Sequence, residues 1–171
     1  MKTNQKGFSL IELLIVVVII GIIAAIAIPN LLAARRASNE GSAISALRTL
    51  HGAQMTYAST YGNKDYAGTA SAGGAGDTVA LSQLGTPGLI DNVLSSATKA
   101  GYNFVGGRIA SSSTTPAQFM FSALPAVTSG VTQTGARKFG VATEGVIMAS
   151  TDLATQYADV AAVQGGTPLS N

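Results

Sequence analysis

The chain has 171 residues, of which 11% are charged, and its formal net charge is +2. So small a positive excess gives no electrostatic basis for a nucleic-acid-binding surface. The chain has no cysteine, which excludes disulfides, zinc–thiolate sites, iron–sulfur clusters and a cysteine nucleophile. The length is sufficient for one compact domain with an appended segment.

The first predicted element is an apolar helix from Phe8 to Ile28. As a helix it would be roughly 31 Å long, about the thickness of the hydrocarbon core of a bilayer. Lys2 and Lys6 precede it, and basic residues on this side predict a cytoplasmic N-terminus with the remainder outside. Glu12 is the one acidic residue inside the segment, and a carboxylate in lipid is costly unless it has a partner or a proton.

Two ordinary interpretations of this segment are open. A secretory signal peptide would end at the small residues Ala25-Ile26-Ala27 and release a domain starting near Ile28, but the apolar run is longer than such peptides usually have. A plain single-span anchor fits the length. Neither interpretation gives Glu12 a role.

A third interpretation comes from the residues Lys6-Gly7-Phe8-Ser9-Leu10-Ile11-Glu12, with Pro29 at the end of the apolar run. They resemble the processing motif of type IV pilins and of the pseudopilins of type II secretion. The resemblance implies that a membrane peptidase recognises Lys6, Gly7 and Phe8, cuts between Gly7 and Phe8, and methylates the new amine of Phe8. Gly7 suits a scissile site because a residue without a side chain lets a protease approach the backbone closely.

The same resemblance predicts that Glu12, Gly21 and Pro29 act in assembly. Glu12 would pair with the positive amine of Phe8, in the same or a neighbouring subunit, because a charge in a low-dielectric bundle needs a partner. Gly21 and Pro29 interrupt a run rich in β-branched residues. In the family such a stretch can lose helical order on assembly, and the alternative is a kinked but continuous helix.

From Leu31 to about Tyr61 the sequence predicts a continuation of the same helix. Apolar side chains recur every three or four residues and predict one buried stripe, formed by Ile44, Leu47, Leu50, Gln54, Tyr57 and Tyr61. The opposite, solvated face is predicted to carry Arg35, Arg36, Asn39, Glu40, Ser42 and Arg48. We interpret Arg35 and Arg36 as interfacial or solvated, with a salt bridge to Glu40 of another subunit as the alternative.

A loop is predicted at 62–76, which is rich in Gly, Ala and Ser. The segments 79–85 and 89–94 predict one or two short helical turns around a turn at Pro87-Gly88. Four strand candidates follow, at 102–105, 118–123, 137–143 and 146–149, the last two joined by a tight turn at Glu144-Gly145. An antiparallel sheet of three to four strands would cover the apolar stripe, which gives an α+β fold. From Thr151 onwards we expect a helical piece around 153–163 or no regular structure.

No catalytic group, cofactor motif or metal site is predicted. His51 is the only histidine, and we expect it to be packed or at the surface. A calcium site needs six to eight oxygen ligands, whereas Asp152 and Asp159 are the only acids after Glu144. We therefore expect no enzyme and no cofactor, and an anchored or secreted enzyme is the alternative with least support.

The resemblance implies a pilin fold with four parts: a leader at 1–7 that is removed, a membrane-spanning and filament-core helix at 8–29, its amphipathic half at 30–61, and a globular head at 62–171. The implied function is a structural subunit of a type IV pilus or pilus-like filament, for adhesion, motility or DNA uptake. The alternative is a major pseudopilin of type II secretion that drives protein export.

The implied partners are copies of the chain in a helical filament, the prepilin peptidase and methylase, an inner-membrane assembly platform with its ATPase, and the membrane, without direct binding of nucleic acid. Before assembly the chain would span the inner membrane once with its N-terminus inside. After assembly it would lie in an extracellular pilus or a periplasmic pseudopilus. Removal of Lys2 and Lys6 with the leader would make the side-chain charges cancel, which suits close packing of identical copies.

Overall fold

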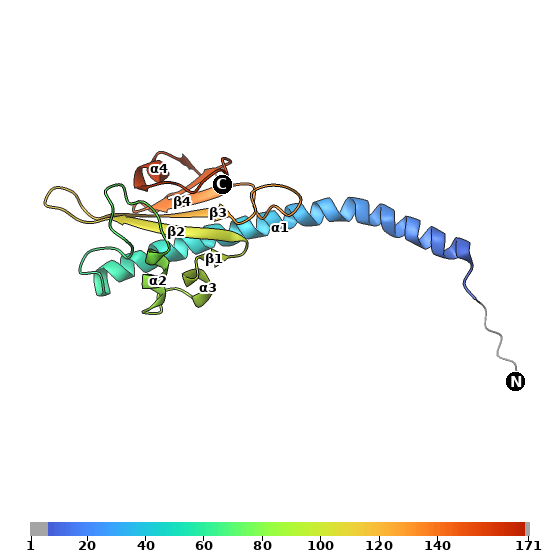
Figure 1. The fold of residues 1–171 in the computed structure, drawn as a ribbon, viewed down its shortest axis with the longest axis horizontal. Helices are drawn as coiled ribbons and strands as arrows, with labels where there is room; N and C mark the ends of the chain where they lie inside the picture. Colours follow the sequence, from blue (N-terminus) through green and yellow to red (C-terminus); the bar gives the residue numbers. More distant parts are fainter. Residues whose placement is uncertain (1–6, 170–171) are drawn as a thin grey trace, which may run out of the picture. The chain divides into compact units, whose positions relative to one another are not determined.

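The computed structural model describes residues 7–169, and the chain divides into two compact units, residues 1–35 and residues 36–171. Helix α1 (Leu10–Thr60) is the longest element and passes from the first unit into the second (Figure 1). It confirms the predicted long helix, although it starts two residues after Phe8 and ends one residue before Tyr61. The remaining helices and the sheet all lie in the second unit.

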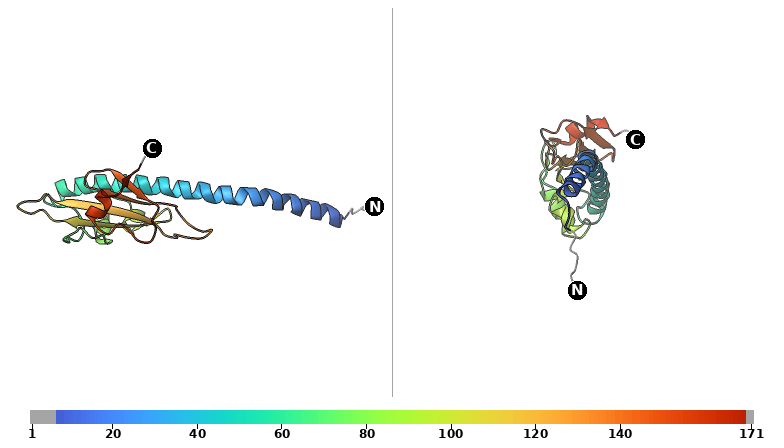
Figure 2. Two further views of the ribbon diagram at one scale, coloured as in Figure 1. Left: turned by 90° about the horizontal axis from the view of Figure 1, so that it is seen from above. Right: turned by 90° about the vertical axis from the view of Figure 1, so that its right-hand side faces the viewer.

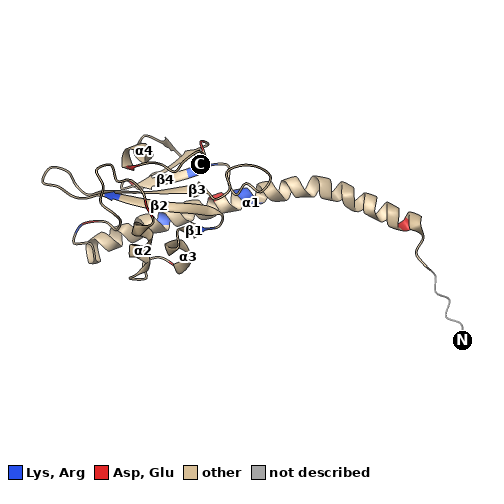
Figure 3. Ribbon diagram, in the orientation of Figure 1, with Lys and Arg blue, Asp and Glu red and all other residues tan. Residues whose placement is uncertain are grey.

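In the first unit α1 is apolar on every side. Each large apolar residue from Leu10 to Ile28 has at least half of its surface exposed in the single chain. No Lys, Arg, Asp or Glu stands between Glu12 and Arg35 (Figure 3). This helix is long and apolar enough to cross a membrane by length and composition.

The second unit contains a six-stranded antiparallel sheet whose spatial order, β1-β2-β3-β4-β5-β6, is the order of the chain. Its strands are β1 (Thr98–Lys99), β2 (Tyr102–Ile109), β3 (Gln118–Pro125), β4 (Lys138–Ala142), β5 (Ile147–Ser150) and β6 (Thr167–Pro168). The four predicted strands are confirmed as β2 to β5. The predicted count is too low because β1 and β6, the edge strands, have only two residues each and carry no alternating pattern.

The main core lies between α1 and one face of the sheet (Figure 2). Leu47 and Leu50 of α1 are fully buried with Phe119, Phe121 and Phe139 of the sheet. Successive residues of a strand point to opposite faces, so the alternate residues of β3 fill this core. The predicted stripe is confirmed in its middle, but Tyr61 is 56% exposed because it follows the end of the helix.

The other face of the sheet is covered by helix α4 (Val160–Gln164) and the chain before it. Met120 points to this side and packs with Val160 and Val163. The predicted helical piece around 153–163 is therefore shorter and later than expected. It begins after Asp159, whose side chain accepts a hydrogen bond from the Ala162 amide and caps the helix.

Helices α2 (Val79–Gly85) and α3 (Asn92–Ser95) complete the main core with Leu81, Leu84 and Leu94, all fully buried. The second predicted turn starts later than residue 89, because Asp91 caps α3 by accepting from the Leu94 amide. At the β4–β5 turn the left-handed φ of +76° falls on Gly145, as the predicted tight turn requires.

Candidate processing and assembly site

The predicted cleavage position lies just outside the regular helix. Gly7, Phe8 and Ser9 are not helical, and α1 begins at Leu10. Phe8 is 84% exposed, and a Cβ built on Gly7 would have no atom within 4 Å. Lys6, the basic residue of the motif, lies outside the described residues. The Gly7–Phe8 bond is thus in open, non-helical backbone, the form in which a protease active site can take up a chain.

Glu12 is bound to the start of its own helix. The Ser9 backbone N–H donates to Glu12 Oε2 at 2.9 Å, and the Glu12 N–H donates to the Ser9 carbonyl at 3.1 Å. This is the spacing of a capping box, in which a glutamate three residues into the helix satisfies the N–H of the capping serine. This role of Glu12 is not among the predictions from the sequence, although the Ser9-Leu10-Ile11-Glu12 spacing indicates it.

The capping contact holds the Glu12 carboxylate against the backbone N–H of Ser9, the residue that follows Phe8. After a cut between Gly7 and Phe8, the new amine would be the group next to the Ser9 N–H that Glu12 already accepts from. Among residues 7–169, nothing donates to the second oxygen, Oε1. In this geometry one carboxylate can hold the helix start through Oε2 and accept a cationic amine through Oε1.

Gly21 and Pro29 lie within the continuous helix α1. Pro29 has no N–H, so the carbonyl four residues before it loses its helical donor. A Cβ built on Gly21 would have no atom within 4 Å, so no contact within the chain requires glycine there. In the single chain the helix is continuous, and its behaviour on assembly stays a prediction.

The predicted solvated face of α1 is wrong at Asn39 and Glu40. Glu40 is buried, and its Oε1 accepts the Ala136 N–H at 2.8 Å. Its Oε2 accepts from Nε and Nη2 of Arg137 at 3.0 and 2.8 Å. Asn39 Nδ2 donates to the Thr134 carbonyl at 2.8 Å. Together these contacts form a latch, here called the Glu40 latch, between α1 and the loop that joins β3 to β4.

The Glu40 latch bears on the predicted salt bridge between subunits. Both oxygens of Glu40 already have donors within its own chain. A guanidinium of Arg35 or Arg36 of another copy would therefore share the Glu40 carboxylate with Arg137 and the Ala136 N–H. Glu40 thus holds α1 to the β3–β4 loop within the second unit, and a salt bridge from Arg35 or Arg36 of another copy stays a prediction.

The late acids Asp152 and Asp159 have separate local roles. Asp152 lies 3.5 Å from Lys138 Nζ, and its pKa is lowered by the Ala154 N–H and then by Lys138. Asp159 caps α4. His51 is half-buried, with Nε2 3.2 Å from the Thr143 carbonyl. In the part of the chain that the structure describes, no three His, Cys, Asp or Glu residues are grouped to hold a metal ion.

Comparison with known proteins places the similarity at the N-terminus. Residues 2–28 match the model of the prokaryotic N-terminal methylation motif. The type IV wide pilus major component PilA4 of Thermus thermophilus is 68% identical over 37 residues, covering 22% of this chain and 28% of the relative. The type IV major pilin protein PilA of Myxococcus xanthus is 50% identical over 54 residues, covering 32% of this chain and 24% of the relative.

The type II secretion system core protein G of Aeromonas hydrophila is 36% identical over 56 residues, covering 33% of this chain and 39% of the relative. The chain thus spans well under half the length of these relatives. No solved structure matches the chain. The resemblance to type IV pilins and type II secretion pseudopilins is therefore confirmed for the processing motif and the start of α1.

Proposed function

We propose that this chain, whose N-terminal segment is that of type IV pilins and pseudopilins, is a structural subunit of a type IV pilus or pilus-like filament. Three observations together support the proposal: an accessible Gly7–Phe8 bond, a capped helix start with Glu12 one turn away, and a helical segment whose large apolar side chains from Leu10 to Ile28 are at least half exposed. Such a helix gains most by packing in lipid or against copies of itself.

The proposed sequence of events begins in the membrane. The chain spans the inner membrane with Lys2 and Lys6 inside, and the prepilin peptidase hydrolyses the Gly7–Phe8 bond and methylates the Phe8 amine. The amine remains cationic after methylation, so it still pairs with a carboxylate. An assembly platform with its ATPase then moves the subunit into the filament, where Gly21 and Pro29 allow α1 to adapt. The subunit itself acts by polymerising, without catalysis.

Glu12 is proposed to set the register between neighbouring subunits. In the filament core its carboxylate and the Phe8 amine of the next copy form an ion pair in a low-dielectric bundle. Removing one partner of a buried pair leaves an uncompensated charge, which costs about 3–5 kcal/mol. A loss of this size per subunit is sufficient to prevent assembly while membrane insertion, which depends on the apolar residues, is retained.

The test compares Glu12→Gln with the matched control Glu144→Gln, an acid on the exposed β4–β5 turn. We expect both variants to be membrane-bound. The mass of the mature chain should correspond, in both, to an N-terminus at methylated Phe8. Glu12→Gln should yield few or no filaments in shear preparations, and the control should match the wild type. Wild-type filament yield from Glu12→Gln would refute the assembly role, and a mature chain starting near Ile28 or at Met1 would refute the processing.

The second candidate is a pseudopilin of type II secretion, supported by the similarity to core protein G. The pilus subunit is preferred because the pilus proteins reach higher identity, 68% in one case. Deletion of the gene separates the two functions. Loss of long surface filaments with normal secretion supports the pilus, whereas retained filaments with exported proteins trapped in the periplasm support the pseudopilus.

A further inference from the structure

The sheet has one long strand, β2, whose outer edge is only partly covered by another strand. β1 pairs with Tyr102 and Asn103 alone. Beyond them, the outward-facing groups of β2 bond to irregular backbone. The Phe104 N–H donates to the Ala97 carbonyl at 2.8 Å. The rest of the edge is covered by residues 62–77, here called the strap, which connect α1 to α2.

The strap satisfies the backbone of β2 as a neighbouring strand would. Asp77 and Gly106 exchange two hydrogen bonds, of 3.0 and 2.8 Å, and the Ser71 N–H donates to the Arg108 carbonyl at 3.1 Å. Backbone groups at a sheet edge are a template for pairing with another chain unless something covers them. The strap is that cover for β2.

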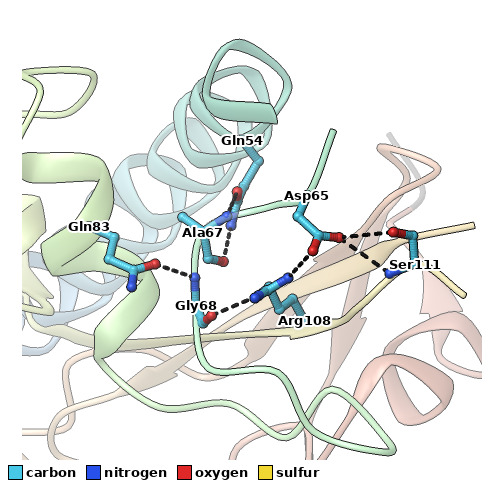
Figure 4. Close-up of polar contacts among 7 residues, drawn as sticks. All are labelled: Gln54, Asp65, Ala67, Gly68, Gln83, Arg108 and Ser111. Carbon is cyan, nitrogen blue, oxygen red and sulfur yellow. Dashed lines mark hydrogen bonds and ion pairs between the residues drawn. The ribbon is translucent and has the colours of Figure 1, made fainter. Parts of the chain in front are cut away.

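Side chains from three elements hold the strap in place (Figure 4). Gln54 of α1 is fully buried and bonds both backbone groups of Ala67, donating from Nε2 at 2.9 Å and accepting on Oε1 at 2.7 Å. Gln83 of α2 accepts the Gly68 N–H at 2.7 Å. Arg108 Nε donates to the Gly68 carbonyl at 2.8 Å. The strap is thus fixed at two consecutive residues by α1, α2 and β2.

Asp65 adds an ionic contact to the same end of the strap. Its Oδ2 lies 2.9 Å from Arg108 Nη1, and its Oδ1 accepts the Ser111 N–H at 3.2 Å. The Ser111 N–H, followed by Arg108, lowers the pKa of Asp65. The Asp65 carboxylate therefore joins the strap to Arg108 within β2 and to Ser111 just after β2. These contacts favour the charged form of the carboxylate.

Gly107 of β2 provides independent evidence that the strap is built into the fold. A Cβ at Gly107 would lie 2.7 Å from the Ala75 carbonyl carbon and would also overlap the carbonyl oxygens of Gly74 and Ala75. The φ of Gly107 is not in the left-handed region, so the backbone does not require glycine there. A glycine inside a strand marks a close approach of another backbone, and here that backbone is the strap.

We propose that the strap conceals a self-complementary pairing edge, and that its release lets the β2 strands of two copies pair antiparallel about Gly106. The partner is a second copy because Gly106 presents both an N–H and a carbonyl to the edge, so the same residue of another copy satisfies both in a two-fold arrangement. The opposite edge of the sheet, β6, is less suited to pairing with a second copy, because Pro168 has no backbone N–H to donate. This inference is independent of the filament function.

The test is Gly107→Val in the full mature chain in detergent micelles, with Asn103→Val as the matched control on an exposed position of the same strand face. Valine favours strands, so it should stabilise β2 if nothing lies against Gly107. We expect Gly107→Val instead to lower hydrogen-exchange protection of the Asp77 amide at least tenfold and to give dimers that dissociate on dilution. The Gly106 amide should lose protection in the dilute monomer and regain it in the dimer, where Gly106 of the second copy accepts its hydrogen bond. Asn103→Val should stay protected and monomeric.

Two results would overturn the inference. Retained protection of the Asp77 amide in Gly107→Val would show that the strap does not depend on the missing side chain. Lost protection of the Asp77 amide without dimers at any concentration would show that the exposed edge is not self-complementary. If Gly107→Val fails to fold, Asp65→Asn provides the same test without a change in strand packing, and it should release the strap and dimerise in the same direction to a smaller extent.

Discussion

Removal of the Glu40 carboxylate should destabilise the head by about 2–3 kcal/mol. In Glu40→Ala the Ala136 N–H, whose contact with Glu40 is part-buried, loses its acceptor, which costs about 1–2 kcal/mol. Arg137 loses two charge-assisted hydrogen bonds. The Arg137 side chain is 40% exposed, so water replaces part of what it loses, and the penalty stays below the value for a fully buried pair.

Thermal and urea unfolding of the mature chain in detergent measure this loss. For a domain of this size, 2–3 kcal/mol corresponds to a fall of about 5–10 °C in Tm. Glu144→Ala, which removes an exposed acid, is the control and should change stability by less than about 0.5 kcal/mol. Arg137→Ala should cost at least as much as Glu40→Ala, because it leaves the buried Glu40 carboxylate without its cationic partner and with the Ala136 N–H as its remaining donor.

The double variant Glu40→Ala with Arg137→Ala isolates the ion pair. If the latch acts as described, the two losses are not additive, and the coupling is about 1 kcal/mol or more. A Glu40→Ala variant as stable as Glu144→Ala would refute the reasoning, since it would mean that the contacts of Glu40 with the β3–β4 loop contribute nothing to the folded state.

Three further outcomes are expected. Gln54→Leu should lose about 2–4 kcal/mol in urea unfolding, because it leaves the buried N–H and carbonyl of Ala67 without partners; stability equal to the wild type would contradict this. Leu50→Ala should lose about 2–5 kcal/mol, whereas the exposed Met55→Ala should lose much less. The lowered pKa of Asp65 predicts stability that is present above about pH 4 and lost as pH falls through the folded pKa. Asp65→Asn should therefore be less stable at pH 7 and show a shallower fall in Tm towards pH 3, and an unchanged pH profile would count against the Asp65 contacts.

The elements with strong internal patterns were predictable from the sequence. The apolar run and the three-to-four spacing gave α1 within two residues at either end, and β2 to β5 followed from their apolar centres. The processing motif needed only local residues, and it is the part that the comparisons confirm. The Ser9–Glu12 cap is also predictable from the sequence, because it depends only on a spacing of three residues.

The features that depend on distant partners were not predictable. Glu40 resembles a surface acid because its partner Arg137 lies 97 residues away along the chain. The sequence predicts the strap only as a loop, since neither its Gly and Ala content nor the glycine at 107 shows which edge of the sheet it covers. The short strands β1 and β6 likewise form because neighbouring strands offer free groups, and their own sequences do not favour pairing.

The strand order has a kinetic consequence. Every strand pairs with the strand just before it in the chain, so each pairing closes a short loop, and contacts between residues near in sequence form quickly. The sheet can therefore grow from β1 towards β6 as the chain emerges, with no strand waiting for a later one. The docking of α1 is the late step, because it depends on β4 and on the Glu40–Arg137 pair. The apolar face of α1 would thus stay exposed until β4 (Lys138–Ala142) has been synthesised. We expect the nascent chain to be most vulnerable to proteases and to aggregation during that interval.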